Sequence, residues 1–189
     1  MKQEAIPLHR LFFGILRASE TDKRIREEAW RWSDGARLVA PERHHITIGI
    51  LDDHPTLPVG LVESMVAIGG SAAIKPFPIR FNRIDENGGS VVLLPDERNA
   101  SLTSLRRQIV ERMRRRGIRQ RQGYSFSPHM TVAYRHGSIS SQAIDAFSWA
   151  VDEFVLIDSH VGLSHHEVLG RWKLREPAEA QYQLCFGQA

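Results

Sequence analysis

Two short segments carry the residue types best suited to chemistry: His45-Ile46-Thr47-Ile48 and His129-Met130-Thr131-Val132. Side chains two positions apart lie on the same face of a β-strand, so each histidine would share a face with its threonine. The isoleucine, methionine and valine side chains would anchor the other face in a core. The first alternation continues, which predicts Gly49 on the histidine face and Ile50 on the core face. Two such strands side by side would line one groove with two imidazoles and two hydroxyls.

The repetition exceeds what chance would give. The sequence has nine histidines and five threonines in 189 residues, and random placement of them produces roughly 0.2 His-x-Thr triplets. Two triplets on alternating strands therefore indicate a shared purpose. The alternative is a pair of ordinary edge-strand histidines.

This set of groups suits displacement at a phosphodiester. One proton must leave the attacking oxygen and another must reach the leaving oxygen, and two histidines that titrate near neutrality can do both. Threonine hydroxyls can bond the non-bridging oxygens and stabilise the charge that grows on them. A cyclic phosphate, already formed by the 2′-hydroxyl of RNA, needs only water to open it and no metal ion. The residues are symmetric, so they do not tell the acid from the base.

A block of arginines indicates a polyanionic partner. Between Arg106 and Arg121 the only acid is Glu111. The arginine guanidinium is a planar fork that suits phosphate oxygens, and a local basic block is the footprint of nucleic acid. The alternative is a solvated helix face followed by a basic loop. The block comprises arginines 106, 107, 112, 114, 115, 116, 119 and 121, of which Arg114, Arg115 and Arg116 are candidate substrate-binding residues.

Aromatic residues and the other histidines are further candidates for ligand or metal binding. Tyr124 and Phe126 could stack on an unpaired base, with core packing as the alternative for Phe126. The pairs at 44–45 and 165–166 invite a zinc interpretation, but adjacent histidines on a strand face opposite ways and no accompanying ligand pattern is present. We therefore expect no metal ion and no other cofactor. The remaining histidines are interpreted as surface or loop residues: His9, His54, His136 and His160.

Composition predicts one soluble domain spanning residues 1–189. Apolar content of 42% and charged content of 25% are ordinary values. The single cysteine, Cys185, excludes an internal disulfide and fits a reducing compartment. The apolar run at 11–16 is too short to span a bilayer. We expect a cytoplasmic monomer with no membrane partner.

The elements expected along the chain predict an α+β fold. Helices are expected from about residue 20 to Gly35, at 57–68 with an end at Gly69-Gly70, at 97–116, and as a short turn at 140–146. Each half would hold a helix and one His-x-Thr strand, giving a bilobal fold in which two antiparallel sheets face each other across a central cleft with helices outside. Strands are expected at 10–17, 45–51, 76–84, 90–94, 129–135, 149–162, 165–175 and 181–186.

These motifs resemble the paired H-x-T-x motifs of the 2H phosphoesterase superfamily. The chain is similar in particular to the bacterial RNA 2′,3′-cyclic phosphodiesterases, also called 2′–5′ RNA ligases. Two further stretches match that family: the opening at 10–15, and the ending at 156–159 with 166–172, where His166 stands for a tyrosine-like residue. The resemblance covers most of the chain in order and spacing.

The resemblance implies a bilobal fold with both motifs in a central cleft. It implies that His45 donates a proton to the departing ribose oxygen and that His129 accepts the proton of water, while Thr47 and Thr131 hold the phosphate. The substrate would be RNA with a 2′,3′-cyclic phosphate end, such as a tRNA fragment, or a cyclic nucleotide. The product would be a 2′-phosphate, and the reverse reaction could join RNA ends through a 2′–5′ bond without ATP.

One position departs from the family. Many bacterial members carry an arginine where this chain has Tyr134, followed here by Arg135. Adjacent residues on a strand face opposite ways, so Tyr134 and Arg135 are expected on opposite faces unless the strand bulges, and both residues are candidates for substrate binding. The alternatives to an RNA enzyme are a non-catalytic RNA- or nucleotide-binding module and a phosphodiesterase for a small cyclic phosphate. Both histidines favour an enzyme, and the arginine block favours RNA.

Overall fold

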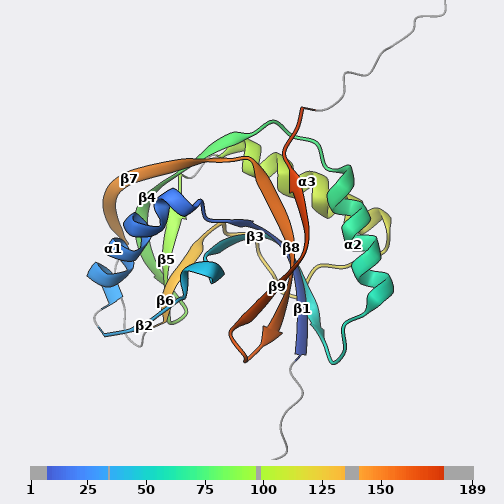
Figure 1. The fold of residues 1–189 in the computed structure, drawn as a ribbon, viewed down its shortest axis with the longest axis horizontal. Coiled ribbons are helices and arrows are strands. Elements are labelled where there is room, and N and C mark those ends of the chain that lie inside the picture. The colour runs from blue at the N-terminus through green and yellow to red at the C-terminus, as the bar shows by residue number, and fades with distance from the viewer. Residues whose placement is uncertain (1–7, 34, 97–98, 135–140, 177–189) are drawn as a thin grey trace, which may run out of the picture.

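The structure, a computed structural model, describes residues 8–33, 35–96, 99–134 and 141–176. In these residues a curled antiparallel sheet is accompanied by three α-helices, which confirms the α+β class (Figure 1). The helices are α1 (Asp22–Ser33), α2 (Val59–Ser71) and α3 (Ala100–Arg115). The strands are β1 (Leu8–Leu16), β2 (Arg37–Leu38), β3 (His45–His54), β4 (Phe77–Asn87), β5 (Ser90–Pro95), β6 (Met130–Tyr134), β7 (Gln142–Val151), β8 (Glu153–Val161) and β9 (His165–Lys173).

The sheet consists of two halves that meet at the motif strands. Its order is β7-β4-β5-β6-β3-β1-β8-β9, with β2 also paired to β6. We call β4, β5, β6 and β7 the middle half and β1, β3, β8 and β9 the outer half. Figure 1 shows them side by side. A single residue pair, Ile46 with Met130, joins them, so the two expected sheets are halves of one continuous sheet.

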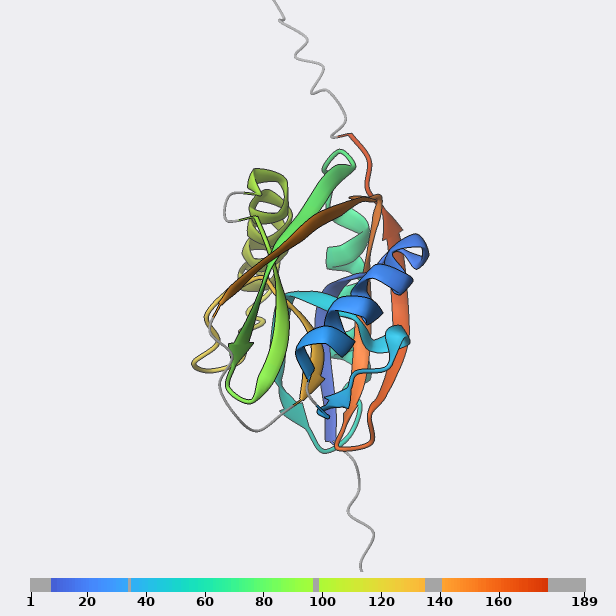
Figure 2. The same ribbon diagram turned by 90° about the vertical axis from the view of Figure 1, so that its left-hand side faces the viewer.

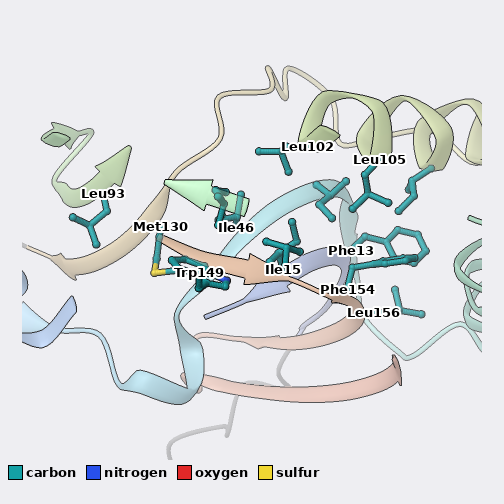
Figure 3. Close-up of a cluster of buried hydrophobic side chains, with 14 of the residues drawn as sticks. Phe13, Ile15, Ile46, Leu93, Leu102, Leu105, Met130, Trp149, Phe154 and Leu156 are labelled. Atoms are coloured by element: carbon teal, nitrogen blue, oxygen red, sulfur yellow. The ribbon is translucent and has the colours of Figure 1, made fainter. Parts of the chain in front are cut away.

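One hydrophobic core runs through both halves and explains why they hold together. Leu93, Met130 and Trp149 from the middle half belong to the same buried cluster as Phe13 and Phe154 from the outer half (Figure 3). Side chains of α3 complete the cluster between them. Separating the halves would expose this shared apolar surface to water, which is unfavourable, so the cluster stabilises their contact.

The opposite face of the outer half carries a second, smaller cluster. Phe12, Val155 and Ile157 form it, with Leu16 and Ile50 packed alongside. Phe12 lies between two residues of the main core, so alternation along β1 turns it to the other face. The outer half is therefore apolar on both sides.

A register shift in β3 overturns part of the expected alternation. Phe13 pairs with Gly49 and Gly14 pairs with Thr47, so Ile48 is an extra residue on β3. As a result Gly49 faces the main core, where an added Cβ would lie 3.7 Å from Met113 Sδ. Ile50 turns to the Phe12 cluster. The prediction of Gly49 on the histidine face and Ile50 on the core face was wrong.

The helices cover different parts of the sheet. α1 contacts β2, β5 and β6, whereas α2 contacts β8 and β9, and α3 contacts β3. Figure 2 shows the curled sheet from the side with α1 in front of it. α3 begins at Asn99, whose side-chain oxygen accepts a hydrogen bond from the Leu102 amide at 2.9 Å and so caps the helix. None of the helices in the described ranges is long and apolar enough to cross a membrane.

The predicted end of α2 at Gly69-Gly70 was wrong, because the helix continues to Ser71. Gly69 is buried, and a Cβ there would lie 2.6 Å from the Trp172 indole. Close packing of a strand side chain against the helix therefore explains this glycine, in place of a helix stop.

The helical turn predicted at 140–146 was also wrong, because residues from Gln142 belong to β7. A register shift against β4 places Ile144 and Phe147, three residues apart, both against the core. That spacing imitates one face of a helix, which explains the error. The strand expected at 181–186 lies outside the described residues.

Candidate active site

The two motif strands meet at the motifs themselves. Ile46 pairs with Met130 in antiparallel register. Extending that register by one residue each way sets His45 opposite Thr131 and Thr47 opposite His129. The two histidines are then diagonal neighbours, and such positions in an antiparallel pair are about 7–8 Å apart. This spacing leaves room for a phosphate group between the imidazoles.

The same hydrogen bond orients both imidazoles. His45 Nδ1 lies 2.7 Å from the carbonyl oxygen of Arg43, and His129 Nδ1 lies 2.7 Å from that of Ser127. A carbonyl only accepts, so Nδ1 carries the hydrogen in each ring. The other ring nitrogen, Nε2, is then the one that can exchange a proton with a substrate.

The His45 ring is enclosed by aromatic neighbours. Its centroid lies 4.7 Å from that of Phe12 and 5.3 Å from that of His166. The pKa of His45 is lowered to about 4, chiefly by burial and also by the nearby charges of His166, His129 and Arg43, while the hydrogen bond to the Arg43 carbonyl opposes this shift. The contribution of His129 shows that the two motif imidazoles lie within electrostatic range. His45 is neutral at neutral pH in the free protein.

Two residues beside His45 were not singled out as site residues from the sequence. His166 packs edge-on to His45, and burial, aided by the charges of Arg43 and His165, lowers its pKa to about 4. Arg43 Nε is buried with no hydrogen-bond partner in the described residues. A cation there suits an anionic phosphate. Arg43 lies two residues before the motif, but only the pairing of β1, β3, β8 and β9 places His166 beside it.

A cavity of about 970 Å³ opens beside this group. Arg43 and His166 line it, whereas His45 and His129 do not, so it adjoins the histidine pair without containing it. Two of its other cations, Arg171 and Lys173, are ion-paired across the β8–β9 hairpin. Arg43 is therefore the cation best placed to act on a ligand that extends from the motif histidines.

A register shift in β6 repeats the one in β3 and determines where Tyr134 faces. Val92 pairs with Thr131 and Val91 with Ala133, so one residue of β6, Val132, is extra. Val132 and Ala133 both belong to the main core, and Tyr134 then turns to the face of Thr131. The guanidinium of Arg37 lies 5.1 Å from the centre of its ring. Arg135 lies outside the described residues.

The aromatic candidates lie in the segment that leads to His129. Phe126 packs against the main core, and the Arg106 guanidinium lies 4.5 Å from the centre of its ring. Tyr124 is half-buried, and burial raises the pKa of its hydroxyl. These contacts support core packing for Phe126.

The candidate arginines lie away from the histidine face. Arg114 and Arg115 are exposed, and each forms an ion pair of 3.0 Å with Glu111. Arg116 is exposed at the C-terminal cap of α3. This end of α3 packs against the core face of β3 near Gly49. The structure does not bring these arginines together with the motif histidines.

Comparison with known proteins identifies relatives of similar fold. A protein-family model described as the 2′-5′ RNA ligase superfamily matches residues 21–163. A crystal structure of a phosphoesterase is 22% identical with a TM-score of 0.75, covering 90% of this chain and 99% of its own. E. coli LigT complexed with NADP+ is 20% identical with a TM-score of 0.74, covering 89% and 99%. TT0787 of Thermus thermophilus is 19% identical with a TM-score of 0.75, covering 89% and 100%. No curated protein matches the chain.

The family match and the motif geometry agree. The matched residues make up more than half of the chain and include both H-x-T-x motifs. The structural neighbours, all at low sequence identity, share the fold. The chain therefore belongs to the 2′-5′ RNA ligase superfamily, a group of 2H phosphoesterases.

Proposed function

We propose that this protein is an RNA 2′,3′-cyclic phosphodiesterase that opens terminal cyclic phosphates to 2′-phosphates. The observation that carries the proposal is the matched pair His45 and His129, each bonded at Nδ1 to a carbonyl two residues earlier. The family supports a phosphodiesterase or RNA-ligase type of activity. A nucleotide-like ligand is supported by E. coli LigT, whose structures include complexes with 3′-AMP and with NADP+.

The proposed reaction is an in-line displacement at phosphorus. Water attacks the phosphorus while His129 Nε2 takes a proton from it, and the bond from phosphorus to the 3′-oxygen breaks. His45 Nε2 gives its proton to that oxygen, which leaves as a 3′-hydroxyl, and the phosphate remains on the 2′-oxygen. Solvent then returns each histidine to its starting state. The diagonal placement of the two histidines would set one acid and one base on either side of a phosphate, and the assignment of His45 as the acid follows the family resemblance.

The proposed acid must be protonated although burial lowers the pKa of His45 to about 4 in the free protein. An anionic phosphate at Nε2 favours the imidazolium and raises the pKa when substrate binds. Thr47 and Thr131 would hydrogen-bond the non-bridging oxygens, and Arg43 would compensate their charge. Tyr134 faces the same side and is a candidate contact for the ribose or base.

The same groups support ligation, with His45 again giving its proton to the 3′-oxygen that leaves phosphorus. A 5′-hydroxyl of a second RNA would replace water as the nucleophile and lose its proton to His129. Attack on the cyclic phosphate would then form a 2′–5′ bond, and the energy of the strained ring removes the need for ATP.

The test is hydrolysis of a 2′,3′-cyclic mononucleotide and of a cyclic-ended oligonucleotide in EDTA, with the product identified by phosphorus NMR. We expect a 2′-phosphate from both substrates. His45→Asn and His129→Asn should each lower the rate by roughly a hundredfold or more, because each removes a proton-transfer group. His54→Asn, at the other end of β3, is the matched control and should retain activity.

Each other outcome has a definite meaning. Turnover of neither substrate would favour a non-catalytic binding module. Turnover of the mononucleotide alone would favour a small cyclic phosphate as the substrate. Loss of turnover in EDTA would overturn the metal-independent mechanism.

A further inference from the structure

Four of the nine histidines lie in one row across the outer half. His9 on β1 pairs with His54 on β3 and with His160 on β8, and His160 pairs with His165 on β9. Residues paired across neighbouring strands share a face, so these side chains lie on one side of the sheet. His9 and Phe12 are three residues apart on β1, so their side chains lie on opposite faces of the strand. Phe12 contacts His45 on the face of the smaller cluster, so the histidine row lies on the other face, that of the main core.

A buried carboxylate lies between two members of this row. Asp158 precedes His160 by two residues on β8, and its side chain is 1% exposed. Its Oδ2 atom lies 2.6 Å from His9 Nδ1 and 3.4 Å from His160 Nε2. One potential ligand atom from each of the three side chains lies within 4.8 Å of the others.

The hydrogen bond between His9 and Asp158 leaves two other polar atoms of this cluster without a partner. Asp158 Oδ1 and His160 Nε2 are both buried and have no hydrogen-bond partner in the part of the chain that the structure describes. A buried carboxylate is costly unless its oxygens are satisfied, and an unpaired imidazole nitrogen adds to that cost. A positively charged ligand that accepts electron pairs from His160 Nε2 and from the Asp158 carboxylate would compensate both side chains together.

We infer that His9, Asp158 and His160 form a binding site for a divalent transition-metal ion of the Zn²⁺ type. Two imidazole nitrogens and one carboxylate oxygen are a donor set of Zn²⁺, whereas Ca²⁺ and Mg²⁺ prefer six or more oxygens. Ligands of a tetrahedral ion at about 2.0–2.1 Å are about 3.3 Å apart, close to the 3.4 Å between His160 Nε2 and Asp158 Oδ2. The ion displaces the proton shared by His9 and Asp158.

The open side of the cluster offers one more ligand. Glu167 pairs with Asp158 across β8 and β9, and its carboxylate lies 3.9 Å from His160 Nε2. Its side chain is 58% exposed, so it lies at the rim. Glu167 or a water molecule completes the tetrahedron.

This site has a structural role separate from phosphodiester chemistry. It links β1 to β8 through residues 149 positions apart, His9 and Asp158, so the ion stabilises the closure of the outer half. The motif histidines project from the opposite face, and the inference therefore stands independently of the proposed function.

The test uses the full chain without a histidine tag, treated with EDTA and then freed of it. Titration with ZnCl₂ in a calorimeter should show one equivalent bound and a rise in the melting temperature that grows with free Zn²⁺. Asp158→Asn, of nearly the same shape, and His160→Gln should each weaken binding at least tenfold. His129→Asn is the matched control and should bind Zn²⁺ as tightly as the wild type.

A second measurement, made on the wild type, tests the inference even if the variants do not fold. In the wild type, Zn²⁺ should shift the NMR signals of the ring nitrogens of His9 and His160 and leave those of His45 and His129 in place. Binding that is unchanged in both cluster variants, or shifts confined to the motif histidines, would overturn the inference. Phosphodiesterase activity should be equal with and without Zn²⁺, so a failed activity assay and a failed titration can be told apart.

Discussion

The two motif histidines have matched hydrogen bonds and different surroundings. His45 is enclosed by Phe12 and His166, with Arg43 nearby. Desolvation and neighbouring cations both favour its neutral form. A reaction that needs one acid and one base therefore depends on what the substrate does to this imidazole.

We predict that the pH at which the rate falls through deprotonation of His45, the His45 limb of the pH–rate profile, differs between kcat/KM and kcat. In the free protein the pKa of His45 is about 4, so its protonated form is lost as pH rises through that value. A bound phosphate stabilises the imidazolium, which moves the limb in kcat to higher pH. The measurement is a pair of pH–rate profiles, together with NMR titration of His45 with and without inorganic phosphate.

The matched variant for this prediction is Arg43→Gln. Removing the cation should raise the pKa of His45 in the free protein, because Arg43 contributes to lowering it. Coincident limbs in the two profiles, or a His45 that titrates near 6.5 without ligand, would contradict the prediction.

Residue spacing alone was enough to predict part of the site. The pattern at 45–48 and 129–132 predicted the shared faces of histidine and threonine, and the structure pairs the two motif strands as expected. His166 and Arg43 were not predicted as site residues. Their proximity to His45 depends on cross-strand register between β1, β8 and β9, which no local pattern encodes.

The same local irregularity follows both motifs at the scale of the strand. An extra residue comes directly after each His-x-Thr triplet, Ile48 in β3 and Val132 in β6. It reverses the alternation and returns Ile50 and Tyr134 to the histidine face. Alternation predicted the faces of the residues before each bulge and failed after it. In the sequence only Gly49 hints at the bulge in β3, since glycine inside a strand often marks one, and no residue signals the bulge in β6.

The contact of α2 with β9 yields a prediction about stability. An added Cβ at Gly69 would lie 2.6 Å from the Trp172 ring, whereas at Gly70 it would lie 3.6 Å from the indole nitrogen. Gly69→Ala should therefore destabilise the fold by about 1–3 kcal/mol through overpacking, despite the better helix propensity of alanine. Urea unfolding measures the change in the free energy of unfolding.

Gly70→Ala is the control for this prediction. It meets Trp172 at an ordinary contact distance and gains helix propensity, so its stability should be equal or up to about 1 kcal/mol higher. A Gly69→Ala protein as stable as Gly70→Ala would show that Trp172 moves aside without cost.

At the scale of the whole molecule, Arg114, Arg115 and Arg116 lie at the C-terminal end of α3, on the core side of β3, whereas the histidine pair lies on the opposite face. We predict that the triple variant Arg114→Glu, Arg115→Glu, Arg116→Glu weakens binding of long RNA and leaves cleavage of a cyclic mononucleotide unchanged. For every RNA phosphate that the variant no longer neutralises, the dependence of log K on log salt should fall by about 0.7–0.9. Fluorescence anisotropy over a salt series measures this dependence.

The control for the arginine prediction is Arg31→Glu, an exposed charge reversal on α1. It should leave RNA binding close to that of the wild type. Equal losses on long RNA and on the mononucleotide in the triple variant would instead mean that the block supports the site itself.

The sequence predicted most of the helices and strands in their order along the chain. It did not predict which strands belong to which half of the sheet. The expected lobes followed the two halves of the sequence. In the structure, β8 and β9 return from the end of the described chain to pair beside β1, so the middle half is inserted within the outer half. The histidines His9 and His160 come together in the same way.

This insertion sets the order in which a ribosome can complete the fold. Synthesis proceeds at about 5–20 residues per second from the N-terminus, so all four strands of the middle half are translated before β8 and β9. During that interval β1 and β3 can pair with each other while the other edge of β1 waits for β8. His129 thus belongs to the half whose strands are translated first to completion, and His45 to the half that closes last. Nascent chains stalled within β7 would carry both motifs and still lack the strands that enclose His45, so activity should arise only as the last strands are translated.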